Sequence, residues 1–79
     1  MSESKARRRE RFVKLAEKRV NRTLKDLRLI GKLANRTNYV YDEEDVRKIF
    51  RALENELKAA RARFESNGQE PEPQFTLRD

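Results

Sequence analysis

Apolar residues recur along the first half of the chain at the spacing of an α-helix. Because a helix turns by about 100° per residue, the following residues between positions 5 and 35 fall on one broad face: Phe12, Val13, Ala16, Val20, Leu24, Leu27, Ile30 and Ala34. The pattern predicts a long amphipathic helix over about residues 5–35, capped by Ser2 or Ser4. Leu15 and Leu29 lie off this face, so the helix carries more apolar surface than one neighbouring helix covers.

Gly31 is the weak position of this first helix. A glycine can end a helix or lie inside one at a cost of about 1 kcal/mol relative to alanine. Leu33 and Ala34 keep the apolar period beyond it, which favours a helix that continues through Gly31.

A second helix is predicted over about residues 42–66. Its apolar residues are separated alternately by four and three positions, the spacing of a two-position heptad seam: Val46, Phe50, Leu53, Leu57, Ala60 and Phe64. Asp42 suits the N-cap, and the acidic residues 43–45 fill the first turn, where negative charge is favoured. Tyr41 and Val46 have the spacing of a hydrophobic staple.

The segments outside the helices offer candidate partner-binding residues. Tyr39 and Tyr41 lie in the connecting loop, where they either contact a partner or fill the end of a helical hairpin. Residues 67–79 are acidic and contain both prolines, a composition that predicts a disordered tail. Phe75 and Leu77 alternate with polar residues in this tail and are candidates to bind in a groove of a partner.

The composition limits the fold to a small helical one. The chain has 79 residues, of which 43% are charged and 35% hydrophobic, with two Gly and two Pro. Few turns and little core are therefore expected. We predict an all-α fold, a two-helix antiparallel hairpin resembling a coiled coil over residues 1–66. One thin seam gives little stability, so we also predict association: a homo-oligomer, in the simplest case a homodimer of four helices, or a place in a larger assembly.

Charge is distributed unevenly along the chain. Residues 1–41 contain 13 basic and 4 acidic side chains, whereas residues 42–79 contain 7 basic and 10 acidic ones. Basic residues recur every three or four positions on the side of the first helix opposite its apolar face: Arg7, Arg11, Lys14, Lys18, Arg22, Lys25, Arg28 and Lys32. Like charges at this spacing repel each other, so an anionic ligand is expected along this side, unless it is only a solvated surface.

Several functional classes lack the residues that they need. Without Cys or His, the chain offers no thiol nucleophile, no thiolate zinc site and no imidazole base. No glycine-rich phosphate loop and no aspartate-rich calcium loop is found. We therefore predict a non-enzymatic protein with no cofactor and no metal. The sequence has no run of about 18 apolar residues, the length that a membrane span needs, and no recognisable signal peptide. The expected location is therefore cytoplasmic.

Nucleic-acid binding is the leading functional hypothesis. Basic side chains along one side of a helix can contact a phosphate backbone without reading sequence; the eight residues of that side would do so, assisted by Arg8 and Arg9. The alternative is a helical protein–protein interaction module, or an accessory or inhibitor subunit of the antitoxin kind or encoded by a phage or plasmid, whose basic side binds an acidic protein surface. An amphipathic helix lying on an anionic membrane is disfavoured because the apolar face has no Trp and one Phe.

Overall fold

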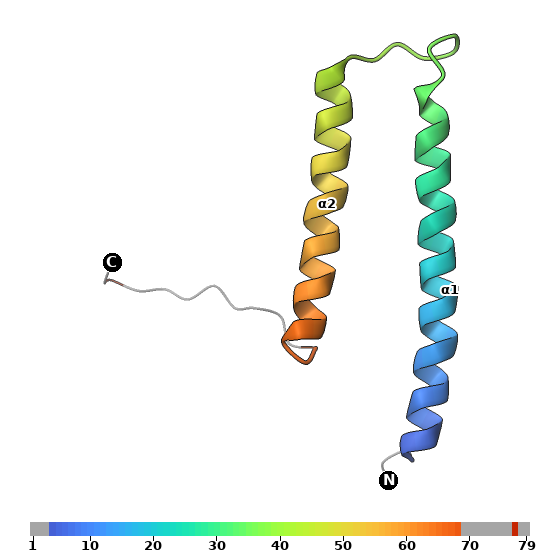
Figure 1. The fold of residues 1–79 in the computed structure, drawn as a ribbon, viewed down its shortest axis with the longest axis vertical. Helices are drawn as coiled ribbons and strands as arrows, with labels where there is room; N and C mark the ends of the chain where they lie inside the picture. Colours follow the sequence, from blue (N-terminus) through green and yellow to red (C-terminus); the bar gives the residue numbers. More distant parts are fainter. Residues whose placement is uncertain (1–3, 69–76, 78–79) are drawn as a thin grey trace. The chain divides into compact units, whose positions relative to one another are not determined.

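The computed structural model describes residues 4–68 and residue 77, and its regular structure is entirely helical (Figure 1). Helix α1 spans Lys5–Gly31, a short 3₁₀ helix η1 spans Lys32–Ala34, and helix α2 spans Glu43–Glu65. No strand occurs within this part of the chain. The prediction of an all-α protein with two long helices is confirmed. The disorder expected for residues 67–79 concerns mainly residues 69–76, 78 and 79, which lie outside the described ones.

The described residues divide into two units, one on each side of the Val40–Tyr41 bond. The first unit contains α1, η1 and the turn that follows, and the second contains α2 with its caps. No side chain in residues 4–68 is buried. Val13, Ala16, Ile30 and Leu53 are half-buried, and they belong to the apolar faces predicted from the sequence. The antiparallel pairing of the two helices therefore stays a prediction.

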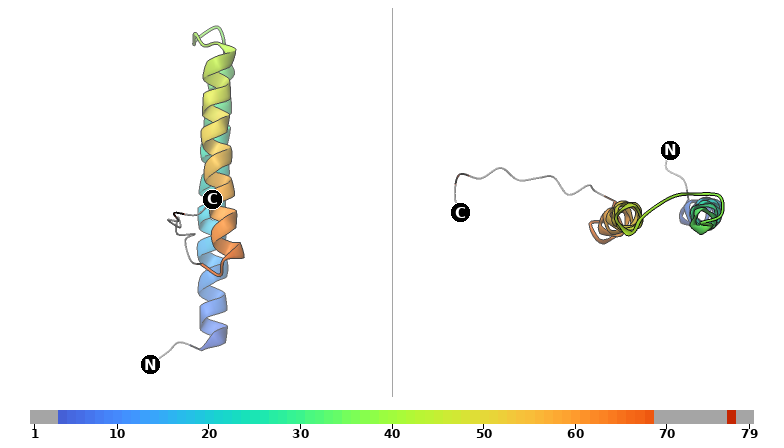
Figure 2. Two further views of the ribbon diagram at one scale, coloured as in Figure 1. Left: turned by 90° about the vertical axis from the view of Figure 1, so that its left-hand side faces the viewer. Right: turned by 90° about the horizontal axis from the view of Figure 1, so that it is seen from above.

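The N-terminus of α1 is capped by Ser4. Its backbone is extended (φ −64°, ψ 156°), and its hydroxyl oxygen accepts a hydrogen bond of 3.2 Å from the backbone N–H of Arg7. This bond satisfies one of the amide donors that a helix start leaves without a partner. The first turn contains no acidic residue, so the positive end of the helix dipole meets basic side chains. Viewed nearly along its axis, α1 runs without a sharp kink (Figure 2).

Gly31 lies inside a continuous helical segment, but the helix changes type after it. Its backbone is right-handed helical (φ −58°, ψ −30°), so it does not act as a left-handed C′ residue. The N–H of Lys32 points to the carbonyls of both Arg28 and Leu29, a shared bond that is common at helix ends. From there the helix tightens into η1, and the helical segment ends at its C-cap, Asn35. The helix predicted for residues 5–35 is thus helical over almost that range, with a 3₁₀ last turn.

Asn35 organises the turn that follows. Its side-chain oxygen Oδ1 accepts a hydrogen bond of 3.0 Å from the N–H of Thr37, and its carbonyl accepts bonds from Asn38 (3.2 Å) and Tyr39 (3.0 Å). This is the local side-chain bonding that favours Asn in turns. The helical segment thus ends near residue 35, as predicted, and this turn begins the connecting loop.

The start of α2 carries a complete capping box. The N–H of Asp45 donates to Oδ1 of Asp42 (2.9 Å), and the N–H of Asp42 donates to Oδ2 of Asp45 (3.0 Å). One turn on, Arg47 pairs with Glu43 (3.9 Å) and more closely with Glu44 (2.8 Å). The predicted N-cap at Asp42 is therefore confirmed, and two acids of the predicted acidic first turn pair with Arg47.

The end of α2 is closed by a Schellman motif. Ser66 is the C-cap, and Asn67 and Gly68 adopt left-handed conformations with φ of 59° and 87°. The N–H of Gly68 donates to the carbonyl of Arg63 (2.6 Å), and the N–H of Asn67 donates to the carbonyl of Phe64 (3.2 Å). These are the two bonds that define the motif. Residues 67 and 68, assigned from the sequence to the tail, thus belong structurally to the end of α2.

Candidate functional site

The helical conformation of α1 gathers seven of the predicted nucleic-acid-binding residues on one side. Their spacing of three or four residues makes successive members neighbours on the helix surface, and we call this set the cationic face: Arg7, Arg11, Lys14, Lys18, Arg22, Lys25 and Arg28. All seven are exposed. At about 1.5 Å per residue, the face extends over roughly 30 Å of helix length.

Three further predicted residues lie outside this face. Lys32 belongs to η1, where the tighter turn moves side chains out of α-helical register. Arg8 is displaced toward the apolar side by its position in the helix. Arg9 lies on the apolar side, with its guanidinium carbon 5.7 Å above the centre of the Phe12 ring. This contact was not predicted from the sequence, although the i,i+3 spacing of Arg9 and Phe12 permits it.

Acidic residues neutralise little of the positive charge of α1. The helix contains eleven basic and three acidic side chains. Glu10 forms an ion pair of 3.5 Å with Lys14, and these side chains are 70% and 76% exposed. Exposed pairs at i,i+4 contribute only about 0.3–0.5 kcal/mol, so Glu10 holds Lys14 weakly and leaves it accessible to another anion. Glu10 and Glu17 both lie at one edge of the cationic face.

Helix α2 has the opposite electrostatic character. It contains six basic and six acidic side chains, and its acids begin in the first turn, where they complement the helix dipole. Neighbouring acids already engage Arg47 within α2. The positive charge of the described chain is thus concentrated in α1.

Each helix also presents an exposed apolar face. On α1 this face includes Phe12, Val20 and Leu24; on α2 the heptad seam includes Leu57 and Phe64, which are 69% and 73% exposed. Contiguous apolar surface of this kind marks an interaction site. It forms a second candidate site, separate from the cationic face.

The four predicted partner-binding residues lie in different parts of the chain. Tyr39 is exposed and Tyr41 is half-buried next to the capping box of α2. Leu77 is 90% exposed, and Phe75 lies outside the described residues. Tyr39 belongs to one unit and Tyr41 and Leu77 belong to the other, and their role in binding a partner stays a prediction.

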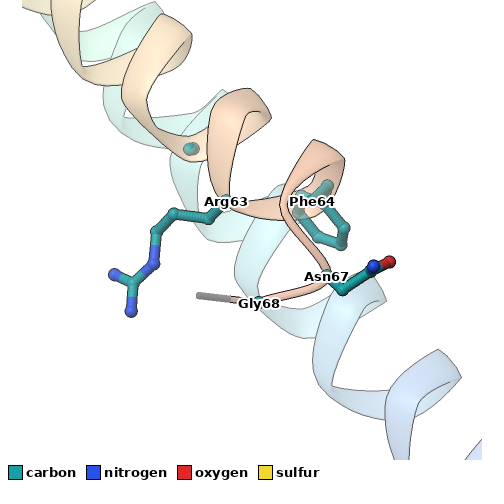
Figure 3. A pocket seen from close by; sticks show the side chains of 5 residues that line it. Arg63, Phe64, Asn67 and Gly68 are labelled. Atoms are coloured by element: carbon teal, nitrogen blue, oxygen red, sulfur yellow. The ribbon is translucent and has the colours of Figure 1, made fainter. Parts of the chain in front are cut away.

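A shallow hollow at the end of α2 was not expected from the sequence. It is lined by Ala60, Arg63, Phe64, Asn67 and Gly68, and it forms where the Schellman turn folds back beside the last helical turn. Figure 3 shows the Arg63 and Phe64 side chains pointing to opposite sides. A specific small-molecule site needs polar groups that converge, and this hollow lacks them.

Residues 4–68 and residue 77 offer neither a metal-ion cluster nor a membrane-spanning helix. This part of the chain contains no group of three or more acidic, His or Cys residues placed to hold a metal ion. None of its helices combines the length and the apolar character needed to cross a membrane.

Comparisons with protein-family models, curated proteins and solved structures gave no match. No role can be transferred from a relative, and fold alone does not imply function. The candidate functional surfaces of this chain are therefore the cationic face and the apolar faces.

Proposed function

We propose that this protein is a small, basic, non-enzymatic nucleic-acid-associated protein that contacts phosphates through the cationic face of α1. The observation that carries the proposal is the contrast between the helices: eleven basic and three acidic residues in α1, six of each in α2. A helix used only for solubility can alternate its charges, as α2 does. The surplus of positive charge on one side of α1 attracts polyanions. A bound polyanion would also relieve the repulsion between neighbouring basic side chains.

The mechanism of binding is electrostatic. Each phosphate neutralised by Lys or Arg releases condensed counterions, and this release supplies most of the non-specific affinity. Phosphate contacts position a protein on nucleic acid but carry no sequence information. The proposed binding is therefore non-specific and strongly dependent on salt.

We further propose that the apolar faces of α1 and α2 pair as an antiparallel hairpin and that two chains form a four-helix homodimer. Support comes from the exposed heptad seam of α2 and from Leu15 and Leu29, which extend the apolar surface of α1. A single helix of this composition gains little stability alone, because helices in proteins are stabilised mainly by packing of an apolar face. Pairing leaves the cationic face outward, and Phe12, at the edge of the apolar face next to Arg8, stays partly open to solvent.

A second candidate function is that of a protein–protein interaction module or an accessory or inhibitor subunit. The exposed apolar faces favour it, since such surfaces commonly bind another helix. In that case the cationic face binds an acidic protein surface, and a co-purifying protein stays bound after nuclease treatment and in high salt. The nucleic-acid proposal gives the opposite result, because nuclease then releases the bound material.

The proposal is tested by charge reversal with a matched control. Lys14, Lys18 and Arg22 are replaced together by Glu in α1, and Lys48, Arg51 and Lys58 are replaced together by Glu in α2. Both variants lose the same net charge, so general electrostatics affects them equally. We expect the α1 variant alone to lose retention on DNA and RNA columns and to flatten the dependence of log affinity on log salt. Equal binding by the two variants would refute the proposal.

A further inference from the structure

The first three turns of α1 combine basic side chains with an exposed aromatic ring. Phe12 is 48% exposed, and the Arg9 guanidinium lies over its ring at 5.7 Å. Arg8 is four residues before Phe12 and is its other neighbour along the helix surface. A cation above an aromatic face is attracted by the ring quadrupole, so Arg9 and Phe12 form a partly exposed cation–π pair.

This pair is continuous with the cationic face. Arg7 and Arg11 are neighbours at i,i+4, Arg8 and Arg11 at i,i+3, and Arg8 and Phe12 at i,i+4. The other edge of the cationic face carries Glu10 and Glu17. A phosphate chain lying on the first turns of α1 therefore meets acidic residues on one side and the Arg9–Phe12 pair on the other.

A single-stranded nucleic acid has the chemistry that fits this arrangement. Its phosphates follow basic side chains, and its unpaired bases expose flat faces that stack on aromatic rings and on arginine planes. In a duplex those faces are covered by neighbouring base pairs, so the duplex can use only the basic residues. Resting on the proposed function, we propose that α1 prefers single strands: Arg7, Arg8 and Arg11 bind phosphates while a base stacks on the Arg9–Phe12 pair.

Substitutions at Phe12 separate stacking from phosphate contact. Phe12→Leu keeps an apolar side chain but removes the ring, whereas Phe12→Tyr keeps the ring. Affinity is measured for oligo(dT), oligo(U) and a DNA duplex of equal length at one salt concentration, with far-UV circular dichroism and light scattering as checks of the fold and assembly. We expect Phe12→Leu to weaken binding of the single strands by about five- to a hundredfold, the range for loss of one base–aromatic stack. Duplex binding and the Phe12→Tyr variant should stay within about twofold of the parent.

A tryptophan at this position gives a direct readout. The chain contains two Tyr but no Trp, so Phe12→Trp introduces the only indole, whose emission can be excited selectively over that of the tyrosines. Stacking of a base on the indole should quench its emission when oligo(dT) is added, and the duplex should quench it much less.

The outcomes distinguish this inference from the proposed function. If the parent binds neither single strands nor duplex, the proposed function fails and the inference fails with it. If charge reversal in α1 abolishes binding but Phe12→Leu leaves single-strand affinity unchanged, phosphate binding stands and the stacking site is refuted. Equal weakening of single-strand and duplex binding by Phe12→Leu, together with altered light scattering, would assign Phe12 to packing between chains and would also overturn the inference.

Discussion

Asp42 and Asp45 cap the start of α2 reciprocally, each side chain accepting a hydrogen bond from the backbone N–H of the other. A helix start leaves amide donors without partners, and this pair satisfies two donors with side chains only three residues apart. The capping box usually has Glu or Gln at the second position; here the shorter Asp45 reaches back to Asp42 at 3.0 Å. The start of α2 is thus determined by local chemistry, without help from the rest of the chain.

Replacement of Asp42 by Ala should therefore destabilise the protein by about 1 kcal/mol, the usual cost of losing an N-cap. Asp42→Ser should retain most of the stability, because a serine hydroxyl can accept the same bond from the N–H of Asp45. Urea unfolding followed by circular dichroism at 222 nm measures both changes. Equal unfolding midpoints for the parent and Asp42→Ala would show that the cap contributes nothing in solution.

Gly31 offers a stabilising substitution. Its φ and ψ are right-handed helical, and a Cβ added there meets no atom within 4 Å. Ala pays less conformational entropy than Gly in a helix, so Gly31→Ala should raise the free energy of unfolding by about 0.5–1 kcal/mol. Thermal unfolding measured by circular dichroism should show a higher midpoint.

The matched control is Gly68→Ala. Gly68 also has open space around its Cα, but its φ of 87° is a conformation that L-residues rarely adopt, so this substitution should destabilise the end of α2. Destabilisation by Gly31→Ala would have a different meaning: it would show that a second chain or helix packs closely against Gly31 in solution.

The helix limits followed from the sequence wherever the signal was local. Asp42 marked the start of α2, and the acidic first turn and the heptad seam defined its course; the helix found, Glu43–Glu65, differs little from the predicted range. The details of the helix ends were less accessible. Residues 67 and 68 were expected to begin the tail, whereas Asn67 and Gly68 form the turn that ends α2, both with positive φ. After Gly, Asn is among the residues that adopt this conformation most readily.

The candidate site was predictable to the same degree. Helical periodicity alone places residues such as Lys14 and Lys18 on one face, and it needs only the helix to be correct. Arg9 was grouped with these residues by sequence proximity, but one helical step turns it to the side of Phe12. Pairing of the helices could not be derived from the sequence. A heptad seam indicates that an apolar face packs against a partner, but the spacing is the same whether that partner is α1, a second copy or another protein.

A charged substitution in the α2 seam decides whether that face has a partner in solution. Leu57 is 69% exposed on α2 itself, and exposed substitutions usually change stability by less than about 0.5 kcal/mol. If α1 or a second chain covers the seam, as we propose, Leu57→Asp buries an unpaired carboxylate in an apolar contact and should cost about 2–4 kcal/mol. Asn55→Asp, on the outer side of the same helix, adds the same charge away from the seam and should have little effect.

Urea unfolding at several protein concentrations shows whether α1 or a second chain covers the seam. A loss of stability through dissociation of chains depends on protein concentration, whereas a loss of stability within one hairpin does not. Equal stability of the two variants would mean that the seam stays solvated, and neither the hairpin nor the homodimer could then account for the stability of this chain.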